Sequence, residues 1–292
     1  MNDIPKVGNA AGTCNRRSLF EKLLKSAADI ITVGPMSVKQ RDTNPGNNEY
    51  QDDNGSVNSL GLPNGGIEWY REHLPEMIAQ AEACGKTLAL SVPPIDPGDM
   101  VKLAEECVKL RVPIAELNAG CNHVFVGNAQ KIPLSYYPED LKRAIHTFVG
   151  IAGKACKLRL KLSPYLPVVP TEVTDAIRPY DIAVVACNTA GNAYMFREDF
   201  RPAIDFGEHL GGYGGSGFKP IVLGQIVQLR KMLPDHHIIG VGGAKNGRDM
   251  WEFMKVGANE VQFGSAWYFT EDARVFGDAL AQFVDIIEQH PI

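Results

Sequence analysis

The feature that most constrains the fold is a regular alternation of short apolar runs with longer amphipathic stretches along the whole chain. The runs are rich in β-branched residues, and the stretches between them have a 3.6-residue hydrophobic spacing, which indicates strands alternating with helices. The predicted strands are Val7–Ala10, Ile30–Val33, Thr87–Val92, Ile114–Asn118, Lys157–Leu162, Ile182–Ala186, His237–Val241 and Val261–Phe263. The predicted helices are Arg17–Ser26, Trp69–Ala83, Gly98–Arg111, Glu139–Ala152, Ile221–Met232, Gly247–Val256 and Asp272–Gln289. This alternation is typical of a parallel α/β sheet.

Eight predicted strands in one chain favour a closed barrel over an open sheet. The chain has 292 residues, and a (β/α)8 barrel typically needs about 250. We see no internal repeat and no Ser/Gly-rich linker that would divide the chain. We therefore predict a single-domain (β/α)8 TIM barrel over residues 1–292, with long βα loops over its C-terminal face.

Composition and charge exclude several classes of function. The formal net charge is −5 and no basic run occurs, so we expect no nucleic-acid or anionic-membrane partner. We find no secretory signal and no apolar stretch of about 18 residues, and we expect a cytoplasmic location. The six cysteines stand singly without a CxxC pair, which predicts reduced thiols and no metal site.

Small and polar residues follow several predicted strands. They occur at Asn9–Gly12, Glu116–Cys121, Ala186–Asn192 and Gly240–Gly243. In a barrel these segments converge on the C-terminal face, where active sites are built. Glycine lets the backbone approach a ligand closely, and Asn and Thr supply uncharged hydrogen bonds. The segments predict a ligand site, although the same residues are also common in simple turns.

Two long polar segments interrupt the alternation. Arg41–Ser56 has one aromatic and no aliphatic residue, so we expect it to lie in solvent. Cys121–Tyr136 follows a predicted strand and has the length of a functional lid loop.

Two strand–turn–helix units near the end of the chain predict an anion site. One is His237–Gly243 followed by Asn246–Asp249, and the other is Val261–Ala266. Helix N-termini favour phosphate, and (β/α)8 barrels often bind phosphate after strands seven and eight. The alternatives are two tight turns without a ligand, or a flavin-free phosphate-binding isomerase or lyase.

Several motifs together resemble the class 1 dihydroorotate dehydrogenase family over nearly the whole chain. The most specific is Gly55–Asn64 (GSVNSLGLPN). The others are Asn9–Gly12, Glu116–Asn118, Leu160–Tyr165, Cys187–Asn192, Gly214–Gly217 with Lys219–Pro220, Gly240–Gly243 and Gly264–Ala266. The resemblance implies an FMN-dependent barrel that oxidises dihydroorotate to orotate. It also implies a soluble electron acceptor such as fumarate, and a homodimer.

The resemblance further implies a set of flavin-binding positions. These are Ala10, Ala11, Gly12, Lys161, Gly217, Gly242, Gly243, Gly264 and Ser265. Lys161 matches a family lysine at the pyrimidine edge of the flavin, where a positive charge stabilises the reduced ring. Lys157, Arg159 and Lys161 alternate along one predicted strand, which favours an inward-pointing Lys161 over a surface lysine.

For the substrate, the resemblance implies hydrogen bonds from amide and hydroxyl groups. The matching residues are Asn58, Asn118, Asn188 and Thr189. Cys121 matches the catalytic base, which must face the flavin across the substrate. Because a free thiol has a pKa of about 8.5, we expect such a base to work better toward alkaline pH. A buried packing role is the alternative for this cysteine.

The chain departs from the family pattern near the substrate. The family's strand-two lysine is replaced within Ile31–Pro35, although Lys39 lies a few residues on. Asn122-His123 stands where the family has Pro-Asn after the base. His123 is a candidate substrate-binding or acid–base residue, or else an exposed loop histidine. These departures leave open a related flavin enzyme, an ene-reductase or dehydrogenase, acting on a different small cyclic substrate.

Overall fold

The computed structural model describes residues 4–96, 98–126 and 129–292. Eight parallel strands form a closed barrel in the order β1-β14-β13-β10-β9-β6-β5-β2. They are β1 (Lys6–Asn9), β2 (Ile30–Val33), β5 (Thr87–Val92), β6 (Ile114–Asn118), β9 (Lys157–Lys161), β10 (Ala183–Ala186), β13 (Ile238–Val241) and β14 (Glu260–Phe263). The predicted (β/α)8 barrel is confirmed, and each predicted strand agrees with the observed one to within a residue at either end.

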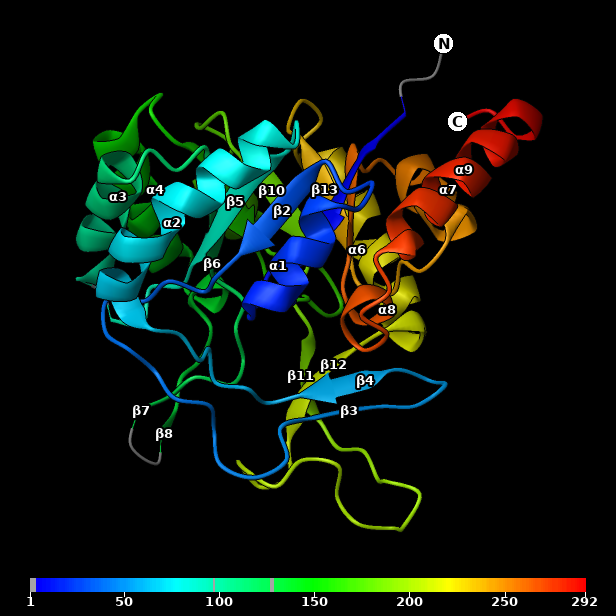
Figure 1. Cartoon of the computed structure of the whole chain (residues 1–292), viewed down its shortest axis with the longest axis horizontal. Helices are drawn as coiled ribbons and strands as arrows, with labels where there is room; N and C mark the ends of the chain where they lie inside the picture. Colours follow the sequence, from blue (N-terminus) through cyan, green and yellow to red (C-terminus); the bar gives the residue numbers. More distant parts are fainter. Residues whose placement is uncertain (1–3, 97, 127–128) are drawn as a thin grey trace.

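Helices surround the barrel and bury the main hydrophobic core against its outer face (Figure 1). They are α1 (Arg17–Leu24), α2 (Gly66–Ala83), α3 (Asp99–Lys109), α4 (Pro138–Ala152), α5 (Thr171–Ile177), α6 (Lys219–Met232), α7 (Gly247–Lys255), α8 (Ser265–Tyr268) and α9 (Arg274–Gln289). Two 3₁₀ turns are η1 (Leu134–Tyr136) and η2 (Ser216–Phe218). The prediction missed the short α5 because its seven residues are too few to display a helical period.

A second, antiparallel sheet lies across the C-terminal end of the barrel, at the bottom of Figure 1. Its strands are β11 (Ala190–Ala193), β12 (Gly211–Gly214), β4 (Ser56–Asn58) and β3 (Glu49–Gln51), in that order. A two-stranded hairpin, β7 (Phe125–Val126) and β8 (Ala129–Gln130), lies in the long loop after β6. We call this sheet and hairpin the lid.

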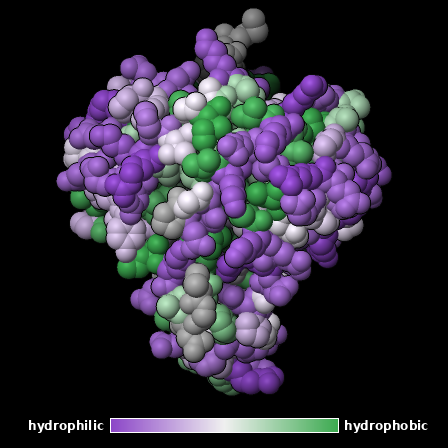
Figure 2. All heavy atoms as spheres, turned by 90° about the vertical axis from the view of Figure 1, so that its left-hand side faces the viewer, coloured by the Kyte–Doolittle hydropathy of each residue, from purple (hydrophilic) through white to green (hydrophobic). Residues whose placement is uncertain are grey.

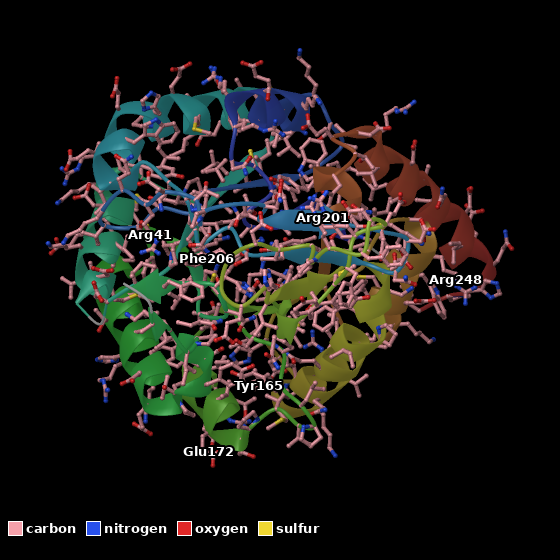
Figure 3. All side chains as sticks on the ribbon, turned by 90° about the horizontal axis from the view of Figure 1, so that it is seen from below. Arg41, Tyr165, Glu172, Arg201, Phe206 and Arg248 are labelled. Atoms are coloured by element: carbon pink, nitrogen blue, oxygen red, sulfur yellow. The ribbon has the colours of Figure 1, made fainter. Side chains whose placement is uncertain are left out.

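The lid corrects one prediction. Arg41–Ser56 does not lie wholly in solvent, because β3 and β4 form a hairpin that pairs with β12. Asn48 and Ser56 are buried in this hairpin. Seen from the lid side, the helices form a ring and the lid segments that carry Arg201 and Phe206 lie within it (Figure 3). The Phe206 and Phe125 rings meet edge to face, with their centroids 4.8 Å apart.

The outer surface is largely hydrophilic. On the face drawn in Figure 2, apolar residues show mainly in patches between polar ones, and the lid forms the narrower lower part. Within the described ranges, we find no helix with the length and apolarity needed to span a bilayer. Cys84 is exposed rather than packed in the core, whereas Cys14, Cys107 and Cys156 are buried as expected.

The barrel interior is polar as well as apolar. Arg159 donates two hydrogen bonds across the barrel to Glu260, at 2.7 and 2.9 Å. One layer nearer the lid, Gln262 Nε2 donates to Glu116 Oε2 at 3.0 Å. Small apolar clusters of Ala10, Val185 and Ile239 fill the space around these side chains. The floor under the C-terminal end is therefore a layered set of polar contacts.

Candidate active site

A cavity lies between the C-terminal ends of the barrel strands and the lid. It encloses about 1200 Å³ when its open mouth is included, which is ample for a ligand the size of a flavin and a small substrate. The sequence-predicted residues that line it are Ala10, Ala11, Gly12, Asn58, Asn118, Cys121, His123, Lys161, Asn188, Thr189, Gly242, Gly243, Gly264 and Ser265. The predicted residues are thus brought together, with one exception.

The exception is Gly217. It is exposed, does not line the cavity, and its N–H donates to the Asn54 carbonyl at 3.0 Å. The chain turns away at Gly215, which has a φ of 84° and lies so close to Gly55 that a side chain would not fit. Gly214 and Gly215 line the cavity in its place.

Lys161 is the buried cation of this cavity. It ends β9, and only 4% of its surface is exposed. It makes no hydrogen bond or ion pair with any residue that the structure describes. An unpaired buried ammonium is costly for a folded protein. The inward orientation predicted from the alternation of Lys157, Arg159 and Lys161 agrees with this placement.

Cys121 lies in the same cavity, on the loop after β6. Burial raises the pKa of its thiol above the ordinary value. A hydrogen bond from the His123 backbone and the positive charges of Lys161 and Arg41 oppose that shift, because each favours the thiolate. The site therefore contains a thiol in an apolar setting with cations near enough to stabilise its charged form.

Arg41 also holds the Cys121 loop against the lid. Its guanidinium donates to the carbonyl of Gly61 at 3.1 Å and to that of Phe125 at 3.3 Å. Asn122, next to Cys121, donates from its side chain to the Thr189 carbonyl at 2.7 Å.

The predicted substrate amides form a chain on one wall. Asn188 Nδ2 donates to Asn118 Oδ1 at 2.9 Å, and Asn188 Oδ1 accepts from the Thr189 N–H at 2.9 Å. These bonds fix the orientation of the Asn188 amide. The Asn118 amide nitrogen is left facing a cavity that also contains Cys121 and Lys161.

His123 is buried, which corrects the alternative of an exposed loop histidine. Only 3% of its surface is accessible, and its Nε2 has no partner in the described part of the chain. Burial lowers the pKa of its imidazole to about 4, so the ring is neutral at physiological pH. The ring packs beside Gly212 and Thr189, where a Cβ on Gly212 would collide with both.

The predicted anion cradle follows β13 and β14. The backbone N–H groups of Gly243, Gly264 and Ser265 donate to no acceptor within the described ranges. Gly243 adopts a φ of 92° beside Gly215. Ser265 Oγ lies 2.7 Å from Ser56 Oγ of the lid. Free N–H groups at the start of α8 suit a phosphate.

Comparison with known proteins identifies the family. The family model described as dihydroorotate dehydrogenase matches residues 4–282. The chain belongs to the dihydroorotate dehydrogenase family. A Streptococcus pyogenes protein named for dihydroorotate dehydrogenase A (fumarate) is 32% identical over 268 residues, covering 88% of this chain and 82% of its own. A Streptococcus pneumoniae protein with the same activity in its name is 31% identical over 263 residues, covering 88% and 81%.

Membership of the dihydroorotate dehydrogenase family confirms the predicted resemblance and the prediction of an oxidoreductase of this type. It also gives meaning to the missing lysine at the end of β2. Val33 is buried there in the main hydrophobic core, and Lys39 is exposed and does not line the cavity. Within the described ranges, Lys161 is the one lysine that lines the cavity.

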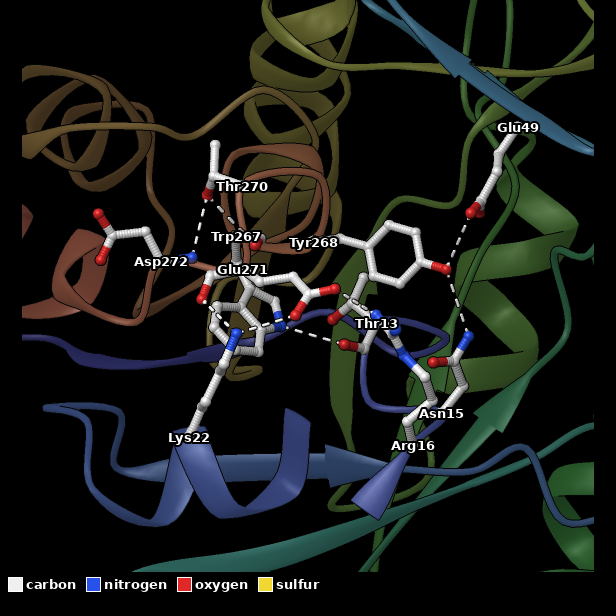
Figure 4. A network of polar contacts seen from close by, with 10 residues as sticks. All are labelled: Thr13, Asn15, Arg16, Lys22, Glu49, Trp267, Tyr268, Thr270, Glu271 and Asp272. Atoms are coloured by element: carbon white, nitrogen blue, oxygen red, sulfur yellow. Dashed lines mark hydrogen bonds and ion pairs between the residues drawn. The ribbon is translucent and has the colours of Figure 1, made fainter. Parts of the chain in front are cut away.

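Sequence reasoning missed residues at the cavity mouth, which Figure 4 shows. Tyr268 donates from its hydroxyl to Glu49 Oε1 and accepts from Asn15 Nδ2, both at 3.3 Å. All three line the cavity. Glu49 was hidden in the segment assigned to solvent, and Tyr268 follows a motif that indicated only a turn. The pairing of β3 with the lid is the signal that places them, and it is not local in sequence.

Proposed function

We propose that this chain oxidises dihydroorotate to orotate in pyrimidine biosynthesis, with FMN as its cofactor and Cys121 as its base. The observation that carries the proposal is the pairing of a buried, unpaired Lys161 with the Cys121 thiol in one cavity. A flat ring carrying negative charge is the ligand that such an ammonium lacks.

The cavity wall fits a flavin. A Cβ on Gly264 would come no nearer to another residue than 3.7 Å, at Ala10, so the wall here is flat and open. Ala10, Ala11 and Gly12 would lie along the ring, with Lys161 at its pyrimidine edge. The N–H groups at Gly243 and Ser265 would hold the phosphate. FMN, when bound, supplies the hydride acceptor.

Cys121 would remove the proton. Oxidation of a CH–CH bond needs a base for the proton lost from one carbon while a hydride leaves the other. The His123 N–H and the charges of Lys161 and Arg41 would stabilise the thiolate that performs this step. Asn58, Asn118, Asn188 and Thr189 would orient the ring of the substrate through its C=O and N–H groups. His123, neutral and with a free Nε2, would add one further hydrogen bond.

The substrate carboxylate would bind to backbone groups. Leu60, Gly61 and Leu62 line the cavity, and their N–H groups donate to no acceptor in the described part of the chain. Gly61 and Leu62 have φ of 80° and 62°. Consecutive N–H groups in such a turn form an anion-binding concavity. This cradle would take over part of the role of the missing strand-two lysine.

The electron acceptor and the assembly complete the proposal. Fumarate would take up the hydride and a proton to give succinate, in the same cavity after orotate leaves. The names of the relatives, which specify fumarate, support this acceptor. By the same family resemblance we propose a homodimer that works in the cytoplasm.

The test is spectroscopic. The purified protein should be yellow with FMN, and anaerobic dihydroorotate at alkaline pH should bleach it. Cys121→Ala should keep the flavin but slow bleaching by about 10² to 10⁴-fold, and fumarate should restore the colour of the reduced wild type. Flavin that stays oxidised with dihydroorotate, but bleaches with another cyclic amide, would support a different substrate, which the loss of the strand-two lysine favours.

A further inference from the structure

The barrel strands carry four buried charged side chains in the part of the chain that the structure describes. They are Glu116, Arg159, Lys161 and Glu260. Arg159 and Glu260 neutralise each other through two hydrogen bonds of 2.7 and 2.9 Å. The remaining two, one acid and one base, need a separate explanation.

Glu116 and Lys161 have no ion-pair partner within 4 Å among the described residues. Glu116 is fully buried, and its only hydrogen bond accepts from Gln262 Nε2 at 3.0 Å. Glu116 Oε1 and Gln262 Oε1 have no donor within the described ranges. A neutral amide cannot balance a buried carboxylate, so the charge of Glu116 must be offset from elsewhere.

The register of the barrel places the two charges close together. On neighbouring strands β6 and β9, Glu116 pairs with Arg159 and Asn118 pairs with Lys161. Side chains two residues apart on a strand share a face, so Glu116 and Lys161 both point into the barrel. Lys161 lies one layer nearer the cavity, directly above the layer of Glu116 and Gln262. With Arg159 already neutralised, each is the nearest unmatched charge to the other.

We propose that Glu116 is a positioning residue that acts through Lys161: its carboxylate is the counter-charge of that ammonium and lowers the reduction potential of the bound flavin. The inference rests on the proposed function, in which Lys161 lies at the pyrimidine edge of FMN. A lone ammonium there would favour the reduced ring strongly and hinder its reoxidation. A carboxylate one layer below offsets part of that field, so that both halves of the reaction remain downhill.

The experiment measures the midpoint potential of the bound flavin by anaerobic titration against a reference dye. Glu116→Gln keeps the shape of the side chain and removes its charge, so the potential should rise, with the reduced form favoured at least about tenfold more. Lys161→Met should move the equilibrium the opposite way. The double variant should lie between the two, because both charges are removed together.

Two further variants separate charge from structure. Gln262→Met removes the hydrogen bond to Glu116 but leaves its charge, and it should move the potential much less than Glu116→Gln. Gln262→Glu adds a second carboxylate in the same layer and should lower the potential. It keeps the inference testable if Glu116→Gln does not fold.

The outcomes are distinct. A Glu116→Gln protein with an unchanged or lower potential, or a Gln262→Met protein that shifts as far, would overturn the counter-charge role while dihydroorotate still bleaches the wild type. A wild type that binds no flavin would remove the proposed function, and this inference with it.

Discussion

Two positions on one strand treat a buried charge in opposite ways. Arg159 of β9 lies in the lower barrel and forms a two-bond ion pair with Glu260, with 7% and 1% of their side chains exposed. Lys161, two residues on, is equally buried but pairs with nothing that the structure describes. The lower barrel is therefore complete as a folded structure, whereas the upper barrel has polar groups that a ligand would have to satisfy.

The same division runs through the rest of the molecule. The buried side-chain atoms without a partner, in the described ranges, all belong to barrel strands or to segments over the barrel mouth. His123 Nε2, Glu49 Oε2 and Glu116 Oε1 are among them. None lies on the outer helices. Unsatisfied polarity is thus concentrated where we propose that substrate and cofactor bind, which is expected of a preorganised site.

The largest expected effect tests this contrast directly. Arg159→Met leaves Glu260 buried without its partner, and should lower the free energy of unfolding by about 3–5 kcal/mol. Lys161→Met removes a charge that makes no close contact, and should change the stability of the flavin-free protein by less than about 1 kcal/mol. Urea denaturation of both apoproteins measures the difference.

The same pair of variants should reverse their order when FMN is added. FMN should stabilise Arg159→Met about as much as the wild type, and Lys161→Met much less. Equal losses of stability in the two apoproteins would show that the two charges play the same structural role.

The sequence was informative where structure is local. The barrel strands follow from short β-branched runs, and the alternation of Arg159 and Lys161 was sufficient to place both inside. The lid was not predictable in this way, because β3, β4, β11 and β12 are short, polar and paired across more than a hundred residues. The burial of His123 and the position of Glu49 depend on that pairing. The departure of Gly217 from the cavity depends on one turn at Gly215.

A second prediction concerns the pH dependence that His123 should add. Its pKa in the folded protein is about 4, below the value of about 6.5 expected when unfolded. Between these values the unfolded chain binds a proton that the folded one does not, so stability is complete above about pH 6.5 and is lost as pH falls toward 4. The loss should be about 3 kcal/mol.

Denaturation at pH 7 and pH 5 measures this effect against His123→Asn, which keeps a polar side chain but cannot titrate. The variant should lose less stability than the wild type between the two pH values. Exposed His73 on α2 offers the control, because His73→Asn should leave the pH dependence unchanged. A wild type and His123→Asn protein with the same pH dependence would contradict the burial of a neutral imidazole.

The smallest expected effect lies at the edge of the lid. Tyr268→Phe removes the hydroxyl that joins Glu49 of β3 to Asn15 after β1 (Figure 4). These bonds are long and partly exposed, so their loss should cost about 0.5–1 kcal/mol. The cost should fall on the lid alone, since Ser56 and Ser265 still join the two layers at 2.7 Å. Amide hydrogen exchange should therefore quicken across β3 and β4 and stay unchanged in β9 and β14. Faster exchange in the barrel strands as well would mean that lid and barrel open as one unit, and that the division between a complete lower barrel and an adjustable mouth does not extend to their dynamics.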